Sequence, residues 1–303
     1  MNLFTVIQAG PLTTYQDLGR YGHMAKGLTE GGPMDARSFA IANQLVDNDI
    51  DKTALEITLG GLSLKCLAAC SIALAGAFCP ITVNNKPQPM WKTLHLKKND
   101  QLNIGFAALG ARAYLAVSGG FLAPVWFDSS ATVVREEMGK PITKGQVLEG
   151  HESYHTTTKS LPYLQQPSMK PHVELRFVKG YQAKHFSEEA LAVFTRQPYK
   201  LSKQIDRMGF RLEGEKVPTS IRELYSEGIA KGSIQITGEG QPIVMMRDRQ
   251  TIGGYPKLGA VISADLDKLA QLTQGATVVF NPISADESIQ LYRDYWQSIQ
   301  TTF

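Results

Sequence analysis

The sequence predicts a mainly β protein built from two β-rich halves with a few peripheral helices. Short apolar runs separated by Gly, Asn and Pro recur at fairly regular intervals, a cadence typical of a sandwich or barrel rather than of alternating strands and helices. A polar stretch over residues 151–171 contains three prolines and has no apolar periodicity, so we interpret it as a linker or exposed loop. A chain of 303 residues, 43% apolar, has enough length for two ordinary domains. We therefore predict an N-terminal domain over residues 1–160 and a C-terminal domain over residues 161–303.

The N-terminal half begins with an apolar strand at residues 4–7. Asp35 is a good N-cap for a helix over residues 36–46, whose apolar residues share one face. Short strands are predicted next, at residues 55–59, 62–66, 71–75, 81–83, 102–106 and 112–118. Asn84 and Asn85 separate two of these apolar segments and indicate a hairpin turn, because asparagine tolerates a left-handed backbone.

The C-terminal half opens with a strand at residues 172–178, and Ser187 caps a helix that runs to about residue 195. Further strands are predicted at residues 210–213, 233–237, 243–246 and 276–280. The apolar spacing over residues 258–272 indicates a helix. A last helix follows Ser284, and its predicted buried stripe consists of Ile289, Tyr292, Trp296 and Ile299. Because Gly31-Gly32 and Gly253-Gly254 each precede a predicted helix, the two halves hint at a duplicated architecture.

The bulk composition argues against several classes of function. The net charge is +3, with 31 basic and 28 acidic residues, and no polybasic stretch suggests a nucleic-acid partner. The N-terminus lacks the features of a secretory signal, and no apolar run approaches the roughly 20 residues that span a bilayer. We expect a cytoplasmic protein with no membrane partner. Cys66, Cys70 and Cys79 are odd in number and are predicted to pack as small hydrophobic residues, without a disulfide or a metal site.

Several well-known catalytic motifs are absent from the sequence. No G-x-x-x-x-G-K-[ST] run indicates a phosphate-binding loop, and no strand leads into G-x-G-x-x-G. Ser118 lacks the glycine two residues before it that a nucleophile elbow requires. No H-E-x-x-H motif is present. Any site is therefore predicted to rely on charged and amide side chains delivered by loops.

Polar residues are densest in residues 246–257, which follow an apolar strand and carry two glycines. The alternative to a site is a tight β-turn with solvated charges. Three further loops, at residues 16–20, 31–35 and 203–209, have similar chemistry, in which guanidinium groups suit carboxylate or phosphate and lysine suits a developing oxyanion. The predicted catalytic residues are Asp206, Asp248 and Lys257. The predicted binding residues are Gln16, Asp17, Arg20, Asp35, Arg207, Ser233, Gln235, Gln250, Thr251, Gly253, Gly254 and Tyr255. We expect these loops to converge on one cleft that another polypeptide completes.

These loops also carry a resemblance to a known family. The segments concerned are residues 10–14, 16–20, 31–35, 54–61, 112–120, 206–209, 226–228, 232–235 and 248–257. From about residue 5 to residue 280, the chain resembles the biotin-dependent carboxyltransferase-like family. That family includes the C subunit of 5-oxoprolinase, KipA, the proteins called allophanate hydrolase subunit 2, and one half of the urea carboxylase carboxyltransferase domain.

The resemblance implies two cyclophilin-like β-barrel subdomains and a site completed by a partner like KipI or the B-type 5-oxoprolinase subunit. It further implies work with an A-type subunit in an ATP-dependent 5-oxoprolinase, which opens 5-oxoproline to glutamate with ATP as the cofactor. The cations Arg207, Arg249 and Lys257 would then suit a transferred phosphate and the substrate carboxylate.

Two alternatives remain open within the same resemblance. One is a carboxyltransferase acting on urea or a related amide, with biotin carried by another chain, because this sequence has no Met-Lys-Met acceptor. The other is a regulator that binds a KipI-like kinase inhibitor. The chain also departs from the family at residues 128–132, which read Asp-Ser-Ser-Ala-Thr, so the contacts expected there are undefined.

Overall fold

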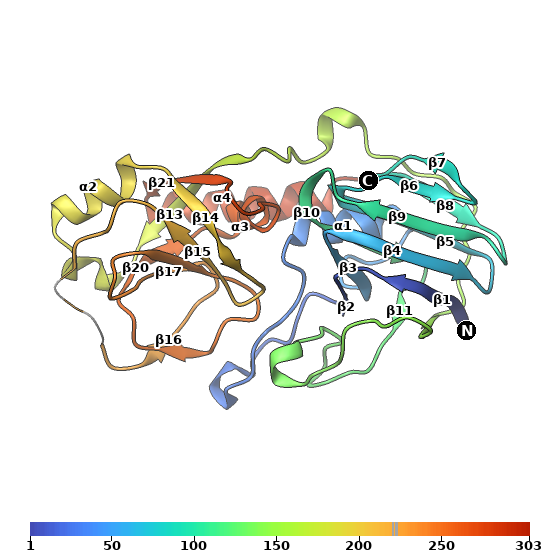
Figure 1. Ribbon diagram of the computed structural model, residues 1–303, viewed down its shortest axis with the longest axis horizontal. Helices are drawn as coiled ribbons and strands as arrows, with labels where there is room; N and C mark the ends of the chain where they lie inside the picture. Colours follow the sequence, from blue (N-terminus) through green and yellow to red (C-terminus); the bar gives the residue numbers. More distant parts are fainter. Residues whose placement is uncertain (220, 222–223) are drawn as a thin grey trace. The chain divides into compact units, whose positions relative to one another are not determined.

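The computed structural model describes residues 1–219, 221 and 224–303, and the chain in it is mainly β, as predicted (Figure 1). It divides into two units. Unit 1 comprises Met1–Arg20, Gly31–Met169 and Thr302–Phe303, and unit 2 comprises Tyr21–Glu30 and Lys170–Thr301. The segment Tyr21–Glu30 thus belongs with the C-terminal part of the sequence.

Unit 1 contains two antiparallel sheets. The first has seven strands in the order β11-β12-β1-β4-β9-β6-β7, and the second has five in the order β2-β3-β10-β5-β8. Their bounds are β1 (Asn2–Ala9), β2 (Leu12–Gln16), β3 (Ala54–Thr58), β4 (Gly60–Cys66), β5 (Cys70–Phe78), β6 (Ile81–Val83), β7 (Lys86–Gln88), β8 (Thr93–Leu96), β9 (Gln101–Phe106), β10 (Leu109–Val117), β11 (Phe121–Leu122) and β12 (Val147–Gly150). Every strand predicted in this half is present, while β2, β7, β8, β11 and β12 were not predicted.

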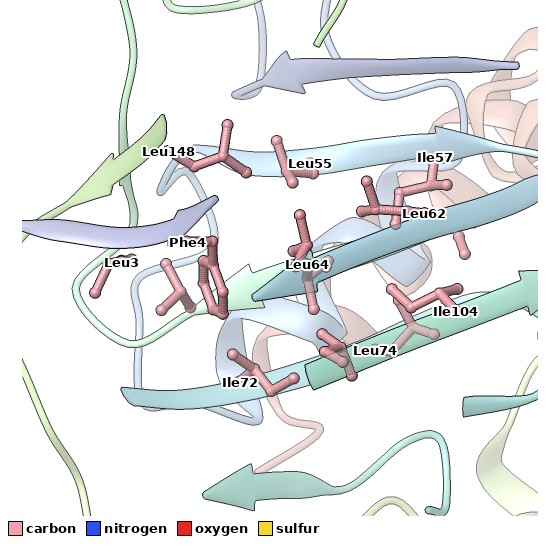
Figure 2. Packing of buried hydrophobic residues seen from close by; sticks show 14 of the residues in the cluster. Leu3, Phe4, Leu55, Ile57, Leu62, Leu64, Ile72, Leu74, Ile104 and Leu148 are labelled. Carbon is pink, nitrogen blue, oxygen red and sulfur yellow. The ribbon is translucent and has the colours of Figure 1, made fainter. Parts of the chain in front are cut away.

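The core of unit 1 follows from the period-two pattern of its strands. In β4, Leu62, Leu64 and Cys66 are buried, whereas Lys65 is exposed. Figure 2 shows Leu62 and Leu64 together with Leu55, Ile72 and other apolar side chains of both sheets in one cluster. All three cysteines are free and buried, as predicted.

A helix covers the other face of the five-stranded sheet. Strand β5 presents Ala73 and Ala75 on that face, and these small side chains let α1 (Ala36–Gln44) approach β5 and β10. Asp35 caps α1 as predicted, because its carboxylate accepts a hydrogen bond from Ser38 N at 2.9 Å. The predicted turn at Asn84-Asn85 is also present, with φ of 50° and 64°, between the paired strands β6 and β7.

Unit 2 is a closed barrel with the strand order β13-β20-β17-β18-β15-β14-β21. The bounds are β13 (His172–Lys179), β14 (Tyr199–Ile205), β15 (Gly209–Glu213), β17 (Ser233–Ile236), β18 (Pro242–Met245), β20 (Lys257–Val261) and β21 (Thr277–Ile283), with a separate pair β16 (Glu227–Gly228) and β19 (Ile252–Gly253). Ser187 caps α2 (Glu188–Arg196) as predicted. Inside the barrel Phe194 of α2 stacks on Phe280 of β21 with ring centroids 4.4 Å apart.

The predicted helix over residues 258–272 is wrong in its first part. Residues Lys257–Val261 form β20, which closes the barrel between β13 and β17, and α3 is confined to Ser263–Ala270. The strand depends on Gly259, because a Cβ there would lie 2.2 Å from Val178 O on the neighbouring strand. Gly253-Gly254 therefore leads into a strand, and the similarity to Gly31-Gly32 before α1 does not extend to a helix.

The last helix, α4 (Ala285–Gln300), is present and is capped by Ser284, but its buried stripe was predicted wrongly. Ile299 is buried, whereas Ile289 is 51% exposed and Tyr292 is 49% exposed. The apolar spacing predicts which residues share one face of the helix. It does not predict whether another element packs against every turn of that face.

Among the described residues, no helix combines the length and apolar character needed to cross a membrane.

Candidate functional site

Four polar side chains come together beside the barrel of unit 2, and we call Glu227, Gln235, Gln250 and Lys257 the amide cluster. The strand registers bring it together, because Gln235 of β17 faces Lys257 of β20 and Glu227 of β16 faces Gly253 of β19. Lys257 Nζ forms an ion pair with Glu227 Oε1 at 2.5 Å, with the lysine side chain 11% exposed. The structure thus joins three residues predicted from the sequence to an acidic partner.

The two glutamines leave a buried donor and a buried acceptor unused. Gln235 is 1% exposed, and neither its Nε2 nor Gln250 Oε1 has a hydrogen-bond partner among the residues that the structure describes. A buried polar atom without a partner costs roughly 1–3 kcal/mol, a cost that a ligand with the complementary groups would remove. The cluster is therefore suited to a small molecule that both accepts and donates a hydrogen bond.

Gly253 lies next to the side-chain amides of both glutamines. A Cβ at this position would lie 2.7 Å from Ile229 Cδ1, 3.3 Å from Gln235 Nε2 and 3.5 Å from Gln250 Nε2. A larger residue would occupy the space between the two amides. The prediction that a glycine here permits close approach is consistent with this geometry.

Glu227 is held from its other side by residues that no sequence pattern singles out. Tyr181 OH and Gln182 Nε2 both donate to the Glu227 carboxylate, and Gln182 Oε1 accepts from Lys257 N at 2.7 Å. Tyr181 and Gln182 lie in a short 3-10 helix, Tyr181–His185, which contacts β20. Glu227 itself stands in one of the segments that carry the family resemblance, and that was its only sequence signal.

Arg207, predicted as a binding residue, and Asp248, predicted as a catalytic one, form a buried ion pair. Arg207 Nε and Nη2 donate to Asp248 Oδ2 and Oδ1, each at 2.9 Å, and both side chains are 9% exposed. Asp248 N also donates to Arg207 O at 2.7 Å, so two of the predicted loops do meet. Asp206 is exposed, and its carboxylate accepts from Met208 N and Gly209 N, which is an Asx turn. The catalytic role of Asp206 stays a prediction.

The other predicted residues of unit 2 differ in burial and in their backbone hydrogen bonds. Ser233 is buried in β17, and Thr251 O accepts from Ile229 N. Gly254 O accepts from Leu224 N at 2.7 Å, while Tyr255 is 38% exposed.

Basic residues gather next to Arg249 in unit 2. Arg249 is 3% exposed, donates through Nε to Ile229 O at 2.9 Å and pairs with Glu30 at 3.2 Å. Burial lowers the pKa of the Lys231 ammonium to about 7, with a further contribution from the Arg247 guanidinium. Protonation of Lys231 near neutral pH therefore lowers the stability of the folded protein.

We expect Lys231→Met to stabilise the protein at pH 7, raising the Tm by about 2–4 °C, the shift that roughly 1 kcal/mol produces in a domain of this size. The folded-state pKa is about 7 and the usual value is 10.5, so between these values the unfolded chain binds more protons and stability rises with pH. The advantage of the variant should shrink as the pH rises towards 10. Calorimetry at pH 7 and pH 9.5, with exposed Lys203→Met as the control, checks this; an advantage that grows with pH would contradict it.

In unit 1 the predicted residues Gln16, Asp17 and Arg20 hold the loop that departs from the family pattern. Asp17 accepts from Gly19 N at 2.8 Å, Ser129 Oγ at 2.6 Å and Ser130 N at 2.6 Å. Arg20 is 2% exposed and donates to Trp126 O and Ala131 O, and Gln16 Nε2 donates to Thr132 O at 3.1 Å. The contacts of residues 128–132, undefined from the sequence, are thus with the loop at residues 16–20. Asp35 acts as the cap of α1.

The comparisons with known proteins agree with this architecture. The family described as "Carboxyltransferase domain, subdomain A and B" matches residues 26–282. The chain belongs to this carboxyltransferase family. It is 33% identical over 296 residues to the C subunit of 5-oxoprolinase from Escherichia coli strain K12, covering 96% of this chain and 95% of that protein.

Larger proteins contain the same carboxyltransferase unit. The urea amidolyase of Lachancea kluyveri is 29% identical over 328 residues, which cover 98% of this chain and 18% of that protein. The crystal structure of the Kluyveromyces lactis urea carboxylase superposes with a TM-score of 0.94 at 28% identity, covering all of this chain and 29% of the other. The resemblance deduced from the sequence is confirmed.

Proposed function

We propose that this chain is the C subunit of an ATP-dependent 5-oxoprolinase. The proposal rests mainly on the alignment with the Escherichia coli C subunit, which covers 96% of this chain and 95% of that relative. The matched region is only 18% of the urea amidolyase. The match to the Escherichia coli C subunit thus spans nearly the whole of that relative, which supports the same role for this chain.

The chemistry of the amide cluster supports a lactam substrate. 5-Oxoproline offers a carbonyl acceptor, an N–H donor and a carboxylate on one small ring. In our proposal Gln235 Nε2 donates to the lactam carbonyl, Gln250 Oε1 accepts from the lactam N–H, and Lys257 faces the carboxylate. The orphaned amide atoms give the cluster the donor and acceptor that this ring needs.

Ring opening needs an activated carbonyl, because the amide is resonance-stabilised. In the proposed reaction the terminal phosphoryl group of ATP passes to the lactam oxygen and ADP leaves. One water adds to the carbonyl carbon and the C–N bond breaks, which gives an acyl phosphate. A second water then releases phosphate and leaves glutamate. We place ATP on, or together with, a partner chain of the same complex. The name of the Escherichia coli relative makes it one component of a larger enzyme, which supports assembly with further subunits, and we propose these to be of the A and B types.

Reconstitution tests the proposed function. Mixing this chain with A-type and B-type 5-oxoprolinase subunits should give ATP-dependent release of glutamate from 5-oxoproline, and omitting this chain should reduce the rate at least about 100-fold, the scale of losing a preorganised set of donors. Lys257→Ala should reduce the rate similarly, while exposed Lys200→Ala should not. A complex that forms and releases no glutamate would contradict the proposal and favour a regulatory role.

A second candidate is a carboxyltransferase that acts on urea with biotin supplied by another chain. It is favoured by the TM-score of 0.94 to the urea carboxylase structure. Urea also has a carbonyl acceptor and N–H donors, and it lacks a carboxylate for Lys257. Replacing 5-oxoproline by urea and adding a carrier chain whose biotin is already carboxylated separates the two, because only the second candidate transfers that carboxyl group to urea.

A further inference from the structure

Unit 1 contains a cavity of about 380 Å³ that plays no part in the proposed reaction. Its walls include Tyr15 from β2, Trp126 and Pro124 from the segment after β11, and Pro141 from the segment before β12. The volume falls within the range of small-molecule sites, and flat apolar side chains with a few polar groups are typical of them.

The cavity walls are held in place by hydrogen bonds to β2 and the loop that follows it. Thr132 N donates to Tyr15 O at 3.0 Å, and Ile142 N donates to Thr13 O at 2.8 Å. Ser130, which also lines the cavity, is fixed by the Asp17 carboxylate. The cavity is therefore preformed, which reduces the entropic cost of filling it.

Tyr15 lines the cavity and carries a hydroxyl that can donate a hydrogen bond. Its side chain is 6% exposed, and no described residue hydrogen-bonds to its hydroxyl. Burial raises the pKa of this phenol to about 12, so the hydroxyl keeps its proton at physiological pH. A ligand carbonyl oxygen would satisfy it.

The charges at the cavity favour an uncharged ligand. Glu137 and Lys140 both line it, one acidic and one basic, so the lining has no net charge. Trp126 is 44% exposed and offers an indole face, on which planar rings stack favourably. We propose that this cavity is a second ligand site, for an uncharged planar ring compound bearing a carbonyl group that accepts a hydrogen bond from Tyr15.

Binding of benzamide by the full chain tests the proposal, measured by saturation-transfer NMR and calorimetry. We expect a Kd on the order of 1 mM, typical of a ligand with so few atoms. Tyr15→Phe keeps the ring and removes only the hydroxyl, and should raise the Kd about 3- to 10-fold, as expected for one hydrogen bond. Cyclohexanecarboxamide, which has the same amide on a non-planar ring, should bind more weakly than benzamide.

A matched pair of variants locates the site. Thr143 lines the cavity, and Thr143→Phe should abolish binding by filling it, whereas the adjacent exposed Lys144 does not line it and Lys144→Phe should leave the Kd unchanged. Circular dichroism establishes that each variant folds. Absence of benzamide binding at 10 mM, a concentration about tenfold above the expected Kd, or a Kd unchanged in either Thr143→Phe or Tyr15→Phe overturns the proposal.

Discussion

Replacing Asp248 by alanine should lower the free energy of unfolding of unit 2 by about 3–5 kcal/mol, the cost of leaving one member of a buried ion pair without its partner. Arg207 donates two hydrogen bonds of 2.9 Å to Asp248, and neither side chain is more than 9% exposed. The variant would bury a guanidinium that has lost its carboxylate. Urea unfolding, followed by signals that report each unit separately, measures the change.

Two controls distinguish this pair from an ordinary surface contact. Asp206→Ala, one residue before Arg207, removes only the acceptor of an exposed Asx turn and should cost roughly 1 kcal/mol or less. The double variant Arg207→Met/Asp248→Leu removes both charges and should be clearly more stable than Asp248→Ala alone. A loss below about 1 kcal/mol for Asp248→Ala would mean that the pair is solvated in solution.

Local signals in the sequence were sufficient for most of the elements. Alternating burial in strands such as β4, the Asp35 and Ser187 caps and the Asn84-Asn85 turn each depend on a few neighbouring residues, and all are present. The strand β20 was predicted as helix because its apolar spacing fits both periods. The segment forms a strand because it pairs with β13 and β17, which are distant from it in sequence. Gly259 makes this pairing possible.

The sequence predicted which polar residues belong to the candidate site better than it predicted their partners. The density of polar side chains at residues 246–257 singled out Gln250 and Lys257, and the structure brings both near Gln235, which entered through a neighbouring segment. The ion pair of Asp248 with Arg207 could not be deduced from the sequence, because burial and partner depend on the tertiary structure. Gln182 contacts the cluster through a 3-10 helix far away in sequence, and no local pattern announces it.

Gln235→Leu should lower kcat/KM for 5-oxoproline in the reconstituted complex about 100- to 1000-fold, the loss associated with one preorganised donor at a reacting carbonyl. The same change should leave the stability of unit 2 unaltered or raise it by up to about 1 kcal/mol, because it removes a buried N–H group that has no partner in the described structure. A glutamine kept for the fold would show the opposite pattern, with stability lost and turnover retained.

Exposed Gln204→Leu on β14 provides the matched control and should change neither quantity. Gln250→Leu should reproduce the loss of turnover, since the lactam N–H would lose its acceptor. Because both amides bind one ring in our proposal, the double variant should cost less than the sum of the two single losses in free energy. Fully additive losses would place the two amides on separate ligands, and the lactam assignment would then fail even if the complex hydrolyses 5-oxoproline.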